Sequence, residues 1–251
     1  MWRYASVHVP VSEPSLRRCP FVLWKGARPD EAQFASRRAL LTLNQIIVIL
    51  KHMKKQIVVI HGGDTFESKE QYFKFLNNFE IDIERYKTSR DDWKPWLRQV
   101  LGDDYEVIIP IMPNKTNAQY DEWKLWMDKI MPFLNDDVIL VGHSMGGSFL
   151  AKYLSESKFP KKIKAVFLIA AMFDYDDDGY SLQSFALPEN LDLQTDKIFL
   201  YHSKDDTVVP YRSLENFKAK FPNATVRTFE DRGHCNQETF PELAEDIKNL
   251  N

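Results

Sequence analysis

Hydrophobic positions along the chain form short continuous runs separated by amphipathic stretches. Six runs rich in β-branched residues lie at 56–62, 105–110, 137–143, 163–170, 197–203 and 224–230. Most of them do not alternate between apolar and polar residues, which is typical of strands buried on both faces of a sheet. Apolar residues at helical spacing lie between or after them, at 92–101, 119–134, 148–156, 211–220 and 238–250.

This strand–helix alternation begins near Met53 and continues to the end of the chain. It predicts an α/β fold with a mostly parallel, six-stranded sheet, right-handed crossovers and helices on both faces. In such sheets a ligand binds at the carboxyl ends of the strands. The glycines point to the same edge, because six of the nine lie at or just after the ends of predicted strands: Gly62, Gly63, Gly142, Gly146, Gly147 and Gly233.

Ser144 is the candidate nucleophile, in the segment "VILVGHSMGG" at 138–147. Gly142 and Gly146 complete the pattern G-x-S-x-G, which is typical of a sharp strand-to-helix turn that exposes a serine. One oxyanion donor would be the amide of Met145. The other would come from the loop "HGGD" after the first strand, from Gly63 or alternatively Asp64. A glycine-rich turn with an incidental serine is the competing interpretation.

The partners of such a serine are expected in the chain order serine, acid, histidine. The segment "SKDDTVVP" after strand 197–203 offers Asp205 and Asp206, and "DRGHCN" after strand 224–230 offers His234. The histidine would take the serine proton, and the acid would fix its tautomer. We favour Asp206 because it stands four residues before Pro210 in a D-x-V-x-P turn, with Asp205 as the alternative.

The remaining histidines and the nearby cysteine are expected to have structural roles. His61 would brace a loop through hydrogen bonds, and His202 lies within a strand end. His143 adjoins Ser144, but its side chain is expected to point away from the nucleophile. Cys235 has no activating base in view and is expected to pack in the interior. No G-x-G-x-x-G follows the first strand, which argues against a dehydrogenase.

With these motifs the chain from Met53 onward resembles the α/β-hydrolases. Within them it resembles the compact serine hydrolases of the retinoblastoma-binding-protein-nine type and their bacterial relatives. The segments that carry the resemblance are "VVIHGG", "WKPWLRQVL", "YEVIIPIMPN", "DEWKLWM", "VGHSMGG", "DDTVVP" and "GH". The resemblance implies a Ser144–Asp206–His234 triad without cofactor or metal, and a carboxylesterase acting on small or medium acyl esters. The alternatives are an amidase, thioesterase or acyltransferase on the same triad, or a hydrolase-fold protein-binding module with little turnover.

Two segments depart from the compact pattern. Residues 64–92 form an aromatic-rich insertion, which is an extra helix packed on the domain, a lid or acyl-pocket wall over the site, or both. The segment "DYDDDG" at 174–179 matches the opening of a calcium loop, but Phe185 stands where the loop requires a glutamate. We therefore expect an acidic loop at the mouth of the site and no metal.

Residues 1–52 differ in composition from the domain at 53–251. They hold eight Arg and Lys against three Asp and Glu, and six of the eight bases are Arg, whereas Lys predominates afterwards. Three interpretations remain: a segment foreign to the native product, a true extension that packs on the domain, or a targeting segment, which its four prolines fit poorly.

The composition of the whole chain excludes several classes of protein. The net charge of −3 argues against a nucleic-acid partner. Two cysteines provide neither a disulfide framework nor metal-ligand spacing, which indicates a reducing compartment or indifference to one. No apolar run has the length of a membrane span, and residues 1–30 do not resemble a secretory signal. We expect a cytoplasmic protein whose partner is a small acyl ester.

Overall fold

A six-stranded parallel sheet organises the computed structural model, which describes residues 54–87, 92–173 and 181–250. The strands are β1 (Lys55–Ile60), β2 (Tyr105–Ile108), β3 (Val138–His143), β4 (Ile163–Ile169), β5 (Ile198–Ser203) and β6 (Thr225–Phe229). Their order in the sheet is β2-β1-β3-β4-β5-β6, and every neighbouring pair is parallel. The predicted α/β fold class is confirmed, and each strand lies where an apolar run predicted it.

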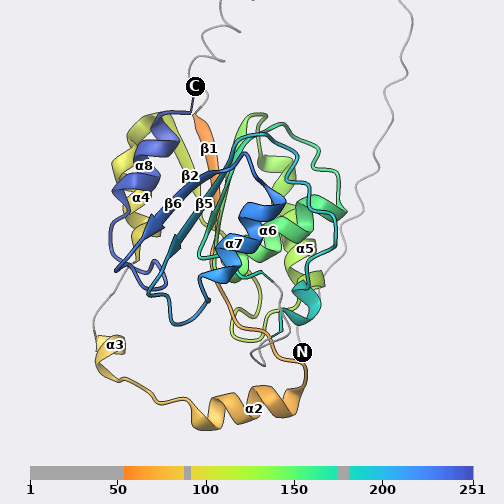
Figure 1. Cartoon of the computed structure of the whole chain (residues 1–251), viewed down its shortest axis with the longest axis vertical. Helices are drawn as coiled ribbons and strands as arrows, with labels where there is room; N and C mark the ends of the chain where they lie inside the picture. Colours follow the sequence, from red (N-terminus) through yellow and green to blue (C-terminus); the bar gives the residue numbers. More distant parts are fainter. Residues whose placement is uncertain (1–53, 88–91, 174–180, 251) are drawn as a thin grey trace, which may run out of the picture. The chain divides into compact units, whose positions relative to one another are not determined.

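Helices cover both faces of the sheet (Figure 1). One face packs against α4 (Trp93–Leu101) and α8 (Pro241–Lys248), and the other against α5 (Tyr120–Ile130), α6 (Met145–Glu156) and α7 (Arg212–Lys220). Short 3₁₀ turns lie at Gly102–Asp104, Met131–Phe133 and Gln183–Phe185. Successive strand residues enter opposite cores, as Val58 and Val59 do on β1. Burial on both faces is the reason why the strands lack alternation in the sequence.

The connectivity creates a switch point between β1 and β3. The chain leaves β1 for β2 at the sheet edge, then returns to form β3 on the other side of β1. Crossovers diverge at such a point, which leaves a crevice at the carboxyl ends of the two central strands. The loop after β1 begins with His61, and Ser144 directly follows β3, so both segments border that crevice.

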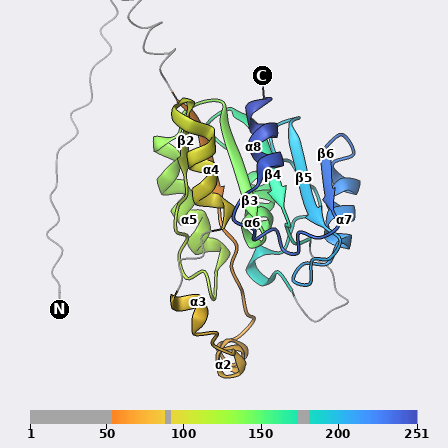
Figure 2. The same cartoon turned by 90° about the vertical axis from the view of Figure 1, so that its left-hand side faces the viewer.

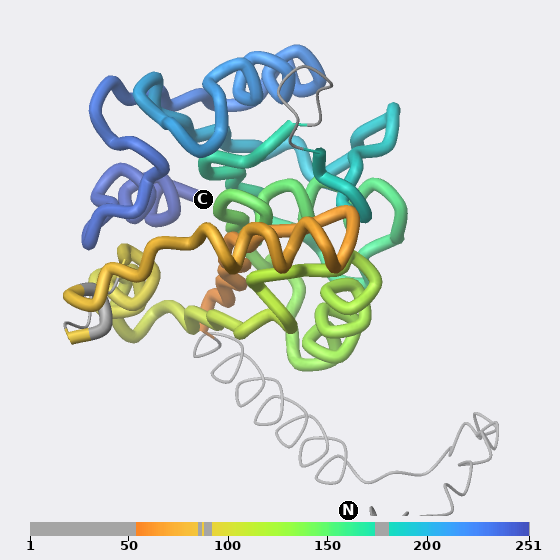
Figure 3. The backbone as a smooth tube through the Cα atoms, turned by 90° about the horizontal axis from the view of Figure 1, so that it is seen from below, coloured from red at the N-terminus to blue at the C-terminus, as the bar shows by residue number. Residues whose placement is uncertain are grey.

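Residues 66–87 of the insertion after β1 form an arm beyond the carboxyl ends of the strands, with helices α2 (Lys69–Asn78) and α3 (Glu84–Lys87) (Figures 1 and 2). Seen from that side, α2 crosses in front of the sheet (Figure 3). The Ser68 hydroxyl caps α2 by accepting from the Gln71 amide at 3.2 Å. No residue of α2 is buried, so the expectation of a helix packed on the domain is wrong for α2.

Two expectations fall on residues outside the described part of the chain. These are the N-terminal extension at 1–52 and the acidic segment at 174–179. The division into an extension and a hydrolase domain stays a prediction. Among the described residues, none of the helices combines the length and apolarity needed to span a membrane.

Candidate active site

Ser144 lies on a sharp turn between β3 and α6. Its φ of 55° and ψ of −126° are strained for a residue with a side chain. The turn is packed so closely that a Cβ on Gly142 would lie 2.5 Å from the Gly146 carbonyl oxygen. A Cβ on Gly146 would lie 2.4 Å from the carbonyl oxygen of Ile60. The two glycines of G-x-S-x-G are therefore required by backbone contact, and they hold Ser144 at the carboxyl end of the sheet.

A cavity of about 580 Å³ opens at this edge. Its lining brings together segments that are far apart in the sequence, and polar side chains form much of it. The lining residues are His61, Gly62, Gly63, Asp64, Asp92, Lys94, Lys115, Thr116, His143, Ser144, Met145, Met172, Val208, Val209, His234 and Asn236.

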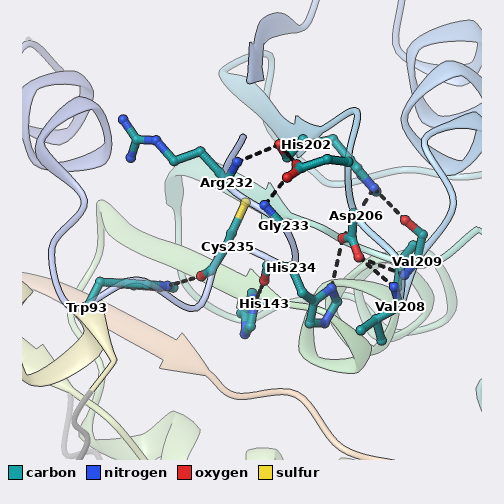
Figure 4. A network of polar contacts seen from close by, with 12 residues as sticks. Trp93, His143, His202, Asp206, Val208, Val209, Arg232, Gly233, His234 and Cys235 are labelled. Atoms are coloured by element: carbon teal, nitrogen blue, oxygen red, sulfur yellow. Dashed lines mark hydrogen bonds and ion pairs between the residues drawn. The ribbon is translucent and has the colours of Figure 1, made fainter. Parts of the chain in front are cut away.

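His234 is paired with Asp206 (Figure 4). Its Nδ1 lies 2.8 Å from Asp206 Oδ2, and the Asp206 side chain is fully buried. Asp206 Oδ1 accepts from the amides of Val208 at 2.8 Å and Val209 at 3.0 Å. Burial alone would raise the pKa of Asp206, but these hydrogen bonds outweigh it and lower the pKa. The carboxylate is therefore ionised at neutral pH and orients the His234 ring.

Asp205, the alternative acid, has a different set of partners. Its Oδ1 accepts from the Ser203 hydroxyl and from the Gly233 amide, the latter at 2.9 Å. The Ser203 oxygen in turn accepts from the Arg232 amide at 2.9 Å. Asp205 thus holds the loop that precedes His234, and the carboxylate that meets the imidazole is that of Asp206.

Ser144 and His234 border the same cavity. No hydrogen bond joins their side chains among the contacts of the described residues. In proteins without bound substrate, hydrogen bonds between catalytic groups are often long and tighten when the substrate binds.

The candidate oxyanion donors lie on either side of Ser144. Met145 is the first residue of α6, and amides in a first helical turn have no partner within the helix. Gly62 packs directly on Ser144, because a Cβ there would lie 2.9 Å from the serine Cβ. The Asp64 amide donates to the Lys115 carbonyl at 2.8 Å. That bond occupies the alternative donor and leaves Gly63 as the candidate from this loop.

His61 and His202 make the structural hydrogen bonds expected of them. His61 Nδ1 lies 2.6 Å from the Gly62 carbonyl, and its Nε2 accepts from the Met112 amide at 2.9 Å. His202 Nε2 lies 2.9 Å from the Val209 carbonyl. Burial lowers the pKa of both rings, so each is neutral and braces a loop of the site.

Cys235 packs in the interior as expected. Its side chain is buried, and burial raises the pKa of the thiol to about 12. A protonated buried thiol is a poor nucleophile. Its carbonyl accepts from the Trp93 indole at 2.9 Å, so residue 235 contributes to the site through its backbone.

His143 borders the cavity, and its ring centroid lies 5.0 Å from that of His234; that its side chain points away from Ser144 stays a prediction. His143 lies two residues after Val141 on β3, so both face the α4 side of the sheet, where Cys235 of the His234 loop also packs. Lys94, also on the cavity wall, was missed. The sequence signal for Lys94 was its position among the apolar residues of the predicted helix 92–101, because a buried lysine usually has a polar partner. In the described part of the chain, no group of three or more His, Cys, Asp or Glu could hold a metal ion.

Comparison with known proteins gives four findings. The sequence model of the family described as serine hydrolase matches residues 83–248. YdeN of Bacillus subtilis (strain 168), named as a hydrolase, is 23% identical over 188 residues, which cover 72% of this chain and 86% of YdeN. The crystal structure of the B. subtilis ydeN gene product matches with a TM-score of 0.60 and 18% identity, over 78% of this chain and 98% of that one. The pyrethroid hydrolase PytH matches with a TM-score of 0.50 and 15% identity, over 78% and 97%.

Proposed function

The chain belongs to the serine hydrolase family within the α/β-hydrolase superfamily, and on that basis we propose that it is a carboxylesterase with Ser144 as its nucleophile. The observation that carries the proposal is the His234–Asp206 hydrogen bond of 2.8 Å beside a serine on a strained turn. A hydroxyl becomes a useful nucleophile only beside a base that a third group orients.

In the proposed reaction, His234 accepts the proton of the Ser144 hydroxyl while the serine oxygen attacks the ester carbonyl. The amides of Met145 and Gly63 donate to the oxyanion that forms. His234 then protonates the departing alcohol, which leaves an acyl group on Ser144. Water activated by His234 attacks the acyl group and releases the acid, and the proton returns to Ser144. Asp206 keeps the Nδ1 proton of His234 in place and stabilises the imidazolium.

The lining of the cavity supports the proposal that the substrate carries an acyl group of small or medium size. Met172, Val208 and Val209 form an apolar part of its wall, and Asp64 and Asn236 contribute polar groups. The apolar side chains suit the acyl chain of an ester, and the polar groups suit its carbonyl and alcohol parts.

The arm is the proposed wall for longer acyl chains. The Phe66 and Phe75 ring centroids lie 5.1 Å apart, those of Phe75 and Phe79 lie 5.5 Å apart, and all three rings border a hollow of about 470 Å³. The Tyr72 hydroxyl lies 3.4 Å from the hydroxyl of Thr116, which borders the main cavity. The arm thus touches the rim of the site through one polar contact, and its apolar hollow lies outside that rim.

The proposal is tested with p-nitrophenyl esters of increasing acyl length and with a fluorophosphonate probe. The wild-type protein is expected to hydrolyse the acetate and butyrate esters, and the probe is expected to label Ser144. Ser144→Ala should keep the fold and lose both properties, and retained turnover in this variant would overturn the proposal. No labelling of the wild-type protein would favour a binding module. Anilide and thioester analogues of one acyl group distinguish an amidase or a thioesterase.

A further inference from the structure

Two successive carbonyl groups beside the proposed base are held by side chains from the α4 side of the sheet. The His234 carbonyl lies 2.8 Å from His143 Nε2, and the Cys235 carbonyl accepts from the Trp93 indole at 2.9 Å (Figure 4). A carbonyl oxygen can only accept, so Nε2 of His143 carries its ring proton. The backbone of the loop is therefore fixed at the residue that carries the catalytic imidazole.

The other ring nitrogen of His143 faces Lys94. The Lys94 Nζ lies 3.4 Å from His143 Nδ1 and also donates to Asp92 Oδ2. Since the Nε2 proton of His143 is committed to the His234 carbonyl, Nδ1 is an acceptor for the lysine. The donors run in one direction, from the Lys94 ammonium to His143 and from His143 to the main chain of His234.

Lys94 and His143 are both buried, and the His143 ring between the lysine and the His234 carbonyl is neutral. Lys94 is 6% exposed and His143 is 4% exposed. Burial lowers the pKa of His143 well below its usual range, and the nearby Lys94 charge acts in the same direction. Burial also lowers the pKa of Lys94, while its ion pair with Asp92 opposes this. A neutral imidazole with one donor and one acceptor is the state that the two contacts require.

The loop that carries His234 has a backbone that needs such support. Gly233 has a φ of 50° and Cys235 a φ of 52°, so residues on both sides of His234 are in the left-handed region. Asp205 and Ser203 hold the amides before His234. His143 holds the carbonyl of His234 itself, so hydrogen bonds fix the backbone both before and at His234.

We propose that His143 and Lys94 are positioning residues for the general base: Lys94 fixes the orientation of the His143 ring, and His143 fixes the main chain of His234. This inference rests on the proposed esterase function. In this role, the side chains of His143 and Lys94 do not contact the reacting atoms. Small displacements of a catalytic group cost rate, so these contacts act on kcat through geometry.

The test compares His143→Met, which removes the donor, with His143→Gln, whose amide nitrogen can occupy the place of Nε2. The rate is measured with p-nitrophenyl acetate per active serine, titrated with the fluorophosphonate probe, so unfolded protein does not count. His143→Met is expected to lower kcat on the order of 10- to 100-fold with little change in KM. His143→Gln should restore most of the loss.

Lys94→Met tests whether the lysine acts through His143. On its own it is expected to lower kcat less than His143→Met, and combined with His143→Met it should add no further loss. Tyr153→Phe is the matched control, because it removes a part-buried 2.7 Å hydrogen bond to Asp128 in the core on the other face of the sheet. It should leave kcat unchanged even if it lowers the melting temperature.

Three results would overturn the inference: wild-type kcat in His143→Met, no recovery in a folded His143→Gln, or losses that multiply in the double variant. If His143→Met does not fold, Lys94→Met and His143→Gln still test the inference. Failure of the esterase proposal is a separate outcome, since the wild-type protein would then show neither Ser144-dependent turnover nor labelling.

Discussion

Asp206→Asn is expected to abolish most of the activity while preserving the fold. Asp206 Oδ1 accepts from the amides of Val208 and Val209, and an asparagine carbonyl can keep both bonds. The second oxygen, 2.8 Å from His234 Nδ1, becomes an NH₂ group in the variant. Two donors cannot face each other, so the His234 ring must present a bare Nδ1 and carry its proton on Nε2. That tautomer cannot accept the proton of Ser144.

The size of the effect follows from the burial of the carboxylate. The side chain of Asp206 is 0% exposed, so water cannot replace its bond to the imidazolium. Loss of the correct tautomer in such a triad lowers kcat on the order of 10³- to 10⁴-fold. Each tenfold step is worth about 1.4 kcal/mol, so the transition state loses about 4 to 6 kcal/mol.

Asp205→Asn is the matched control for this experiment. Asp205 Oδ1 accepts hydrogen bonds from the Ser203 hydroxyl and the Gly233 amide, and an asparagine side-chain oxygen can accept the same two. Both variants are assayed with p-nitrophenyl butyrate after circular dichroism confirms the fold. A folded Asp206→Asn variant within tenfold of wild-type kcat, or an equal loss in Asp205→Asn, would refute the assignment of Asp206 as the triad acid.

Three further predictions follow from the packing and ionisation of the site. Gly146→Ala should lower the free energy of unfolding by about 3 kcal/mol or more, because the new Cβ would lie 2.4 Å from a carbonyl oxygen. Gly102→Ala, whose Cβ meets nothing within 4 Å, should lose only the cost of its positive φ, and equal losses in denaturant unfolding would contradict the packing argument. Cys235 should resist iodoacetamide at neutral pH in the folded protein and react in guanidinium chloride, as peptide mass spectrometry can show, because burial raises its pKa to about 12. Because the pKa of Asp206 is lower in the folded than in the unfolded protein, its ionised carboxylate stabilises the fold at pH values above the unfolded pKa of about 3.9. This stabilisation is lost as the pH falls through the folded pKa, so acid should lower the free energy of unfolding more steeply in wild type than in Asp206→Asn, as urea titrations can show.

The sequence was sufficient to predict the sheet because its strands are buried on both faces. Short continuous apolar runs that alternate with amphipathic helices are typical of strands in a parallel sheet with both faces covered. The tight turn at Ser144 was also predictable, because only glycine fits at Gly142 and Gly146 and the sequence shows both glycines in the pattern G-x-S-x-G.

The arm could not be placed from sequence. Its aromatic residues have the spacing of a helix that buries one face, yet none of the α2 residues is buried. Phe66, Phe75 and Phe79 contact one another instead of the domain core. Hydrophobic periodicity indicates that a face is apolar, but it does not indicate which surface covers that face.

The roles of the three histidines at this edge of the sheet could not be distinguished from sequence position. His61, His143 and His234 each lie at or just after the end of a strand, so position alone assigns any of them to the carboxyl edge of the sheet. Their chemistry is decided by the atoms that each pair of ring nitrogens meets. His61 and His143 each meet a backbone carbonyl and are neutral through burial. Among these three rings, only His234 meets a carboxylate, that of Asp206. A carboxylate on one nitrogen favours a proton on the other in the transition state. That contact is the reason why we propose His234 as the base and His143 as the residue that positions it.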